Sequence, residues 1–150
     1  QRFRVAIENG WPHAHAIVLD SMGRLYVADR NNSRVQVFNQ EGQILSEWRN
    51  LLVPWGFWMT KQDEVWICGS SPMTWRETDT VLGCPPKDQL FMKCNTEGKV
   101  LQQWTMPKGA DGKEQPGELN WVHGLALDAE GNIYAGDIVG KRVQKFVLQK

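Results

Sequence analysis

The chain repeats itself, and this repeat limits the fold more than any other feature. Residues 15–38, HAIVLDSMGRLYVADRNNSRVQVF, align without a gap with residues 123–146, HGLALDAEGNIYAGDIVGKRVQKF. In this register His15 falls on His123. A degraded copy lies between them at residues 54–70. Self-similarity of this kind is the signature of a repeat architecture, in which each copy is one structural unit.

Each copy has the pattern of short β-strands. The segments 15–20 and 23–29 are apolar and rich in β-branched residues, and the turn between them contains Gly23. Residues 34–40 and 44–48 alternate between apolar and polar side chains and are separated by another turn. Four strands in a unit of roughly forty residues are typical of a propeller blade. No segment has a helical period, so we predict an all-β fold.

We expect one domain with three four-stranded blades, which is half of a six-bladed ring. The blades are expected at residues 12–49, 51–105 and 118–150, with residues 1–8 as an outer strand that completes a blade. Known propeller rings have about four to eight blades, so three blades do not close a ring alone. We therefore expect a homodimer that completes the ring; the alternative is that the chain is half of a longer protein.

Composition excludes several classes of partner. The chain has 17 basic and 17 acidic residues, which cancel, and the basic ones are spread along the sequence. This distribution predicts no binding to nucleic acid or to an anionic membrane surface. No apolar run is long enough to span a bilayer. The 3 cysteines form no CxxC pair, so a thiolate zinc site is not expected, and they leave the cellular compartment open.

Two segments resemble the NHL-repeat consensus: VADRNNSRVQVFNQEGQIL at 27–45 and HGLALDAEGNIYAGD at 123–137. The resemblance to NHL β-propellers covers nearly the whole chain. Within that family, the arrangement is most similar to the C-terminal half of the lyase domain of peptidylglycine α-amidating enzymes. The resemblance implies a six-bladed ring that cleaves a peptidyl-α-hydroxyglycine, a small peptide-like substrate, into a peptide amide and glyoxylate. It also implies a secreted or periplasmic protein.

The same resemblance implies roles for particular residues. In that family three histidines, each opening the inner strand of an alternate blade, hold a zinc ion. His15 and His123 match two of these ligands, and Trp55 falls on the blade between them. Arg30 matches the catalytic arginine of the family. The family also has a calcium ligand, an aspartate, directly after its last histidine; here that position is Gly124, so calcium is in doubt.

The third histidine and the catalytic tyrosine of the family lie on blades that this sequence does not contain. His13 offers a substitute, because residues two apart on a strand share a face and His13 could bind a metal together with His15 and His123. Alternatively, His13 lies in the loop before the strand, where it follows Pro12. All three histidines could also be ordinary polar residues at the wet entrance of a channel.

Two functions remain open from the sequence. One is a zinc-dependent carbon–nitrogen lyase, in which the metal acts as a Lewis acid and Arg30 positions an anionic substrate with its planar guanidinium. The other is a non-catalytic NHL propeller that binds a protein or ligand through the long segment 70–89 and a tryptophan-rich middle blade. In that case Arg30 pairs with a carboxylate at the rim.

Overall fold

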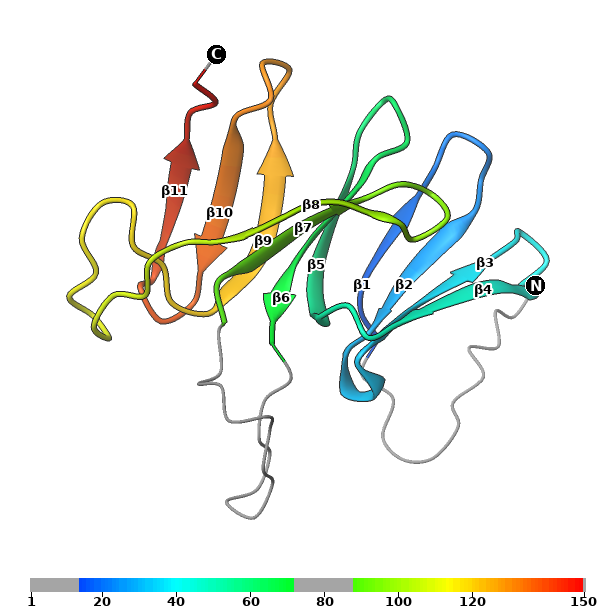
Figure 1. The fold of residues 1–150 in the computed structure, drawn as a ribbon, viewed down its shortest axis with the longest axis horizontal. Coiled ribbons are helices and arrows are strands. Elements are labelled where there is room, and N and C mark those ends of the chain that lie inside the picture. Colours follow the sequence, from blue (N-terminus) through cyan, green and yellow to red (C-terminus); the bar gives the residue numbers. More distant parts are fainter. Residues whose placement is uncertain (1–13, 72–87, 150) are drawn as a thin grey trace.

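The structure is a computed structural model that describes residues 14–71 and 88–149. The described residues form three antiparallel sheets, which stand side by side in chain order (Figure 1). Blade 1 contains β1 (Ala14–Leu19), β2 (Leu25–Asp29), β3 (Arg34–Phe38) and β4 (Ile44–Arg49). Blade 2 contains β5 (Val53–Met59), β6 (Val65–Ser70), β7 (Leu90–Cys94) and β8 (Val100–Thr105). Blade 3 contains β9 (Val122–Leu127), β10 (Ile133–Asp137) and β11 (Arg142–Phe146).

The predicted all-β propeller architecture is confirmed, with one qualification. Blades 1 and 2 have four strands each, whereas blade 3 has three within the described part of the chain. The strand that was expected to complete a blade, residues 1–8, lies outside the described residues. The helix-free prediction holds except for one 3-10 turn, η1 (Arg30–Asn32), among the described residues.

The blades are joined at their first strands, which are the inner strands of the propeller. Strand β1 contacts β5, and β5 contacts β9, whereas within each sheet the strands follow one another outward in chain order. Two apolar clusters fill the spaces between blades. The first joins blades 1 and 2, and it contains Tyr26, Val35 and Trp48 from one side and Ile67 and Met92 from the other. The second joins blades 2 and 3.

Two tryptophans at equivalent positions of the repeat, Trp48 and Trp104, pack between blades. Trp48 is buried in the cluster between blades 1 and 2, where its ring lies 5.4 Å from that of Tyr26. Trp104 stacks on Phe91 at 5.5 Å and packs against the cluster between blades 2 and 3. Their equivalent positions in the repeat therefore perform equivalent packing.

The turn between the first two strands of blade 1 is held by Asp20. Its carboxylate accepts hydrogen bonds from the backbone N–H of Met22 at 3.0 Å and of Arg24 at 2.8 Å. It also accepts from Arg24 Nε at 2.5 Å and from the Tyr26 hydroxyl at 3.0 Å. Gly23 has a φ of 77°, a left-handed conformation that favours glycine.

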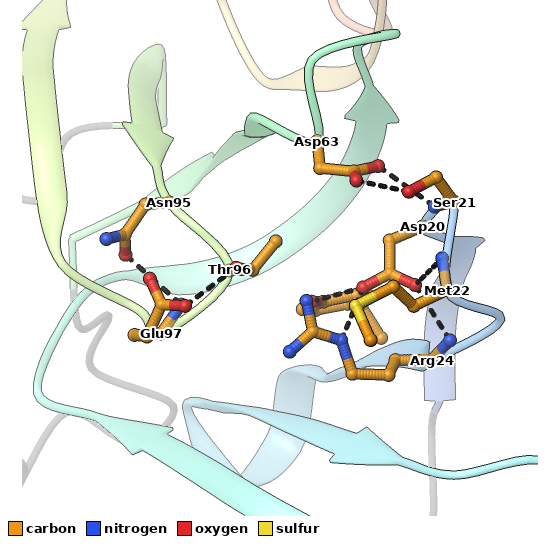
Figure 2. A network of polar contacts seen from close by, with 9 residues as sticks. Asp20, Ser21, Met22, Arg24, Asp63, Asn95, Thr96 and Glu97 are labelled. Carbon is orange, nitrogen blue, oxygen red and sulfur yellow. Dashed lines mark hydrogen bonds and ion pairs between the residues drawn. The ribbon is translucent and has the colours of Figure 1, made fainter.

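This turn also joins blade 1 to blade 2. Asp63, in the corresponding turn of blade 2, accepts hydrogen bonds from the backbone N–H of Ser21 at 2.9 Å and from its hydroxyl at 2.5 Å. Figure 2 shows Asp63 facing Ser21 beside the Asp20 network. The turn ends of the two inner strands are therefore linked by polar contacts as well as by the apolar cluster.

Within the described residues, no helix is long and apolar enough to cross a membrane.

Blade 3 ends in an unpaired edge, because no strand of the described part pairs with the outer side of β11. An open edge of this kind presents unsatisfied backbone donors and acceptors.

Candidate functional site

The three inner strands share an irregularity at the same position of the repeat. In β5 the pairing with β6 passes from Pro54 to Gly56, so that Trp55 is an extra residue. In β9 the pairing with β10 passes from Val122 to Gly124, so that His123 is extra. In β1 the register shifts between Ala14 and Ile17, the interval that contains His15. A β-bulge re-aims the side chain at its site, and bulges are frequent next to functional sites.

These aligned bulges bring His15 and His123 into contact although 108 positions separate them in sequence. Their ring centroids lie 4.3 Å apart and the ring planes are inclined at 70°. Both side chains are half-buried. The histidines at equivalent positions of blades 1 and 3 therefore meet at one place.

Trp55 fixes the orientation of His15. Nδ1 of His15 lies 2.6 Å from the backbone carbonyl oxygen of Trp55. A carbonyl oxygen only accepts hydrogen bonds, so Nδ1 carries the proton and donates it. In its neutral form, an imidazole whose Nδ1 is engaged in this way has a lone pair on Nε2, and a histidine held by a backbone carbonyl is a common arrangement at metal sites.

His123 is held in its neutral form by its surroundings. Burial lowers the pKa of His123 below the ordinary value of 6.5, and the nearby charges of His15 and Arg30 lower it further. A neutral imidazole has a free lone pair at neutral pH, which a protonated one lacks. The electrostatics of the site therefore favour the state of His123 that binds a metal.

Arg30 joins the same site from η1, directly after β2. Its guanidinium lies 5.6 Å from the centre of the Trp55 ring, a cation–π arrangement. The turn that positions Arg30 is braced by Asp29, which accepts hydrogen bonds from the Asn32 side-chain amide at 2.9 Å and from Arg34 Nε at 2.6 Å. These contacts hold the turn, so Asp29 supports Arg30 through the backbone.

Trp121 completes the site and was not singled out in the sequence. Its indole stacks on that of Trp55, with centroids 5.3 Å apart and planes inclined at 22°. Trp121 has a φ of 47°, an uncommon conformation for a bulky residue, directly before β9. Its position two residues before His123 is a signal that could have identified it, because the sequence places His13 in the same relation to His15.

The structure assembles some of the predicted site residues and leaves others undescribed. His15, His123 and Arg30 gather around Trp55, whereas His13 lies outside the described residues. Among residues 14–71 and 88–149, no group of three or more His, Cys, Asp or Glu side chains is close enough to hold a metal ion. The described residues therefore contribute two imidazoles, and Gly124 contributes no side-chain oxygen for calcium.

Open space adjoins this group. A shallow hollow of about 590 Å³, widely open to solvent, lies beside His123 and is lined by Gly124, Gly136 and Val143. A Cβ atom added to Gly124 would meet no atom within 4 Å. A ligand that reaches His123 from this side therefore meets little steric obstruction.

The fold and the site together define a class: part of a β-propeller with polar residues at the inner ends of its blades. Solved structures agree with this class. They include a WD40 β-propeller domain, with a TM-score of 0.59 and 12% identity over 89% of this chain and 36% of that one. Virginiamycin B lyase from Staphylococcus aureus has a TM-score of 0.54 and 11% identity over 91% of this chain and 41% of its own. These identities are low, so the likeness shows the fold alone.

Sequence comparison relates this chain to proteins that contain NHL repeats. Residues 12–38 match the NHL repeat. The chain is 46% identical over 139 residues to NHL repeat-containing protein 3 of Homo sapiens and 44% identical to the Mus musculus protein of that name. Each alignment covers 89% of this chain and 35% of the relative, so the chain spans about a third of the length of the curated relatives it matches. The chain carries an NHL repeat at residues 12–38 and has the fold of part of a β-propeller.

Proposed function

We propose that this chain is a metal-binding NHL propeller unit with a lyase-like site at the inner ends of its blades. One observation carries the proposal: the imidazoles of His15 and His123, from blades 1 and 3, meet with their ring centroids 4.3 Å apart. Two half-buried histidines that converge from distant segments, beside an arginine, are the expected components of a zinc site that acts on an anionic substrate.

The donor chemistry fits zinc. Imidazole nitrogen is a common zinc ligand, and a catalytic zinc site uses three protein ligands and keeps one position open. His15 has its Nδ1 committed to the Trp55 carbonyl, which leaves Nε2 for the metal. His123 supplies a second neutral imidazole, and His13 remains the predicted third ligand. Gly124 offers no such fit for calcium, so no calcium site is proposed.

The proposed reaction follows the resemblance to amidating lyases. A bound zinc ion would act as a Lewis acid and lower the pKa of a hydroxyl group on the substrate. Arg30 would bind the substrate carboxylate through its planar, permanently charged guanidinium. The substrate class is a peptidyl-α-hydroxyglycine, whose carbon–nitrogen bond breaks to give a peptide amide and glyoxylate.

Two structural neighbours lend support from the same fold. They are named virginiamycin B lyase and streptogramin B lyase, with TM-scores of 0.54 and 0.53. A variant of the virginiamycin enzyme in which one histidine is replaced by alanine is described as catalytically inactive. These proteins are only 11% and 10% identical to this chain, so they support lyase chemistry on a related propeller and no particular substrate.

Zinc titration of dialysed protein by calorimetry tests the metal site. His15→Gln and His123→Gln should each weaken zinc binding at least tenfold, whereas Glu130→Gln, on an exposed turn at the other end of blade 3, should not. Equal zinc affinity in all four proteins, or none in the parent, would overturn the metal site. Zinc binding without release of glyoxylate from an α-hydroxyglycine-terminated dipeptide would overturn the lyase step alone.

A second function is favoured by the open hollow beside His123. A non-catalytic propeller could use this space, which is lined by His123, Ile138 and Val143 among others, to bind a ligand or a protein segment. In that case a bound peptide would quench tryptophan fluorescence without turnover, and Trp121→Ala would weaken its binding in the absence of zinc.

A further inference from the structure

The two contacts between neighbouring blades differ at the turn ends of the inner strands. Between blades 1 and 2, the Asp63 carboxylate accepts two hydrogen bonds from Ser21, at 2.9 and 2.5 Å (Figure 2). The repeat places Lys61 of blade 2 at the position of Ser21, and Gly131 of blade 3 at the position of Asp63. Glycine has no side chain that accepts a hydrogen bond, so the link that joins blades 1 and 2 has no counterpart between Lys61 and Gly131.

A row of paired residues beside these turns differs as well. In blade 1, Val18, Tyr26 and Val37 lie opposite one another on adjacent strands, and they lie in or against the apolar cluster between blades 1 and 2. The residues paired in the same way in blade 2 are Trp58, Trp66 and Lys93. The apolar cluster that the described residues form between blades 2 and 3 includes none of these three.

The row of blade 2 instead lines a groove between blades 2 and 3. The groove has a volume of about 600 Å³, and Trp58 is 37% exposed. Leu148 contributes to the wall on the side of blade 3, where its backbone N–H donates to the side-chain oxygen of Asn132 at 3.0 Å. The groove lies between two blades that are both described, and it shares no residue with the site at the bulge end.

Glu64 and Lys93 supply hydrogen-bonding groups to this groove. Nζ of Lys93 lies 2.9 Å from Oε1 of Glu64 and 5.6 Å from the centre of the Trp66 ring. The Glu64 side chain is 33% exposed and that of Lys93 is 18% exposed, so a ligand can reach both. A carboxylate beside an ammonium group offers an acceptor and a donor to two neighbouring hydroxyl groups of one ligand.

This pair exists because the turn of blade 2 is built differently from that of blade 1. In blade 1 the Asp20 carboxylate is fully buried and is bound by Arg24. Blade 2 has Thr60 at the position of Asp20, and the Thr60 hydroxyl accepts a hydrogen bond from the backbone N–H of Glu64 at 3.0 Å. Glu64 falls on the position of Arg24, so the carboxylate moves from the interior of the turn to the wall of the groove.

The charges and the apolar surface of the groove indicate the class of ligand. The lining includes two ammonium groups, of Lys61 and Lys93, and two carboxylates, of Glu64 and Asp128. A charged ligand would meet a like charge as well as an opposite one, so a neutral ligand is favoured. Indole rings beside hydrogen-bonding groups match a sugar ring, which has C–H groups on its faces and hydroxyl groups around its edge.

We propose that the groove between blades 2 and 3 binds the ring of a neutral carbohydrate. The indole of Trp58 packs against a C–H face of the sugar, and Glu64 and Lys93 bind two neighbouring hydroxyl groups. A glucose-like ring fits best, because equatorial hydroxyl groups leave both faces of the ring to C–H groups. This binding requires no metal ion, so loss of zinc binding and loss of sugar binding are separate results.

Saturation-transfer NMR with cellobiose, a neutral disaccharide of glucose, tests the groove in the 150-residue chain. The parent protein should transfer saturation to the C–H protons of the sugar. Trp58→Ala and Glu64→Gln should each weaken cellobiose binding about tenfold, because each removes one of the two kinds of contact. Ile44→Ala, 48% exposed on β4, and Glu41→Gln, on an exposed turn of blade 1, are the matched controls and should bind like the parent.

Rebuilding the polar link between the turns gives a second test. Lys61→Ser combined with Gly131→Asp copies the pair that joins Ser21 to Asp63. Asp63 has a φ of 57°, so an aspartate already adopts the left-handed conformation that Gly131 has at the equivalent position. Linked turns would narrow the groove, and we expect the double variant to bind cellobiose about tenfold more weakly than the parent.

Three results would overturn the proposal. The first is an absence of saturation transfer from the parent to cellobiose. The second is an affinity for cellobiose that is the same in the parent, Trp58→Ala and Glu64→Gln. The third is displacement of cellobiose by tetramethylammonium chloride at equal concentration, because that result would identify the indoles as a cation site.

Discussion

The polar groups at the two ends of the inner strands differ in how completely their hydrogen-bonding capacity is satisfied. At the turn end, the Asp20 carboxylate is surrounded by donors from its own turn, and Asp128 of blade 3 repeats the arrangement with Asn132 and Tyr134. At the bulge end, the indole N–H of Trp55 has no hydrogen-bond partner among the described residues, and His15 contacts the Trp55 carbonyl oxygen through Nδ1. Polar groups whose hydrogen bonds are all made within the protein stabilise the fold, whereas polar groups that can still form hydrogen bonds are available to a ligand.

The largest expected effect is on stability at the turn end. Asp20→Ala removes a carboxylate that is fully buried and leaves Arg24 and Tyr26 without their acceptor. We expect the free energy of unfolding to fall by about 3 kcal/mol, measured by urea denaturation. Asp128→Ala, whose carboxylate is 21% exposed, should cost less. Equal losses at both positions would contradict the role assigned to burial.

The next effect concerns zinc at the bulge end. His123→Ala removes one of the imidazoles proposed to bind zinc, and we expect zinc affinity to fall about a hundredfold, equivalent to about 2.7 kcal/mol. The free energy of unfolding in the absence of metal should change by less than about 1 kcal/mol, because the side chain is only half-buried. A large loss of stability without metal would mean that the histidines are structural, which would remove the contrast between the two ends.

A smaller effect is expected in acid. Burial raises the pKa of Asp20, but hydrogen bonds from Arg24 and Tyr26 outweigh it, so that the pKa lies below the ordinary value of 3.8. The stabilisation is therefore complete above pH 3.8 and is lost as the pH falls through the lower value of the folded state. Unfolding measured from about pH 5 to about pH 2 should show this loss in the parent, and Asp20→Asn should flatten it.

The smallest effect is a shift in titration. Burial, His15 and Arg30 all lower the pKa of His123, so its NMR titration midpoint should lie below 6.5. Arg30→Gln removes one of the positive charges and should raise that midpoint. Lys99→Gln, exposed on a turn of blade 2, serves as the control. An unchanged midpoint in Arg30→Gln would indicate that Arg30 does not act on the site electrostatically.

The repeat allowed much of the fold to be predicted. The alignment of 15–38 with 123–146 predicted the strands, because β-branched runs and Gly-containing turns recur at the same offsets. Strand β1 was expected at residues 15–20 and is found at Ala14–Leu19, and β2 ends at Asp29 as expected.

The site was predictable only in part. Equivalence placed His15 and His123 on one channel, but not in ring contact. The bulges at Trp55 and His123 could not be read from apolar alternation, because one extra residue leaves no compositional trace. The hydrogen bond from His15 to a backbone carbonyl has no sequence signal at all, since every residue carries a carbonyl group.

The bulge shared by the three inner strands has a consequence for how such a protein can change. The bulge is present with histidine in blades 1 and 3 and with tryptophan in blade 2. The irregular backbone therefore does not depend on which side chain occupies this position. Evolution could therefore exchange the residue at this position blade by blade, without rebuilding the sheet. The chemistry at the inner ends of the blades would then depend on one residue from each blade, and each of these residues could be substituted while the sheets stay unchanged.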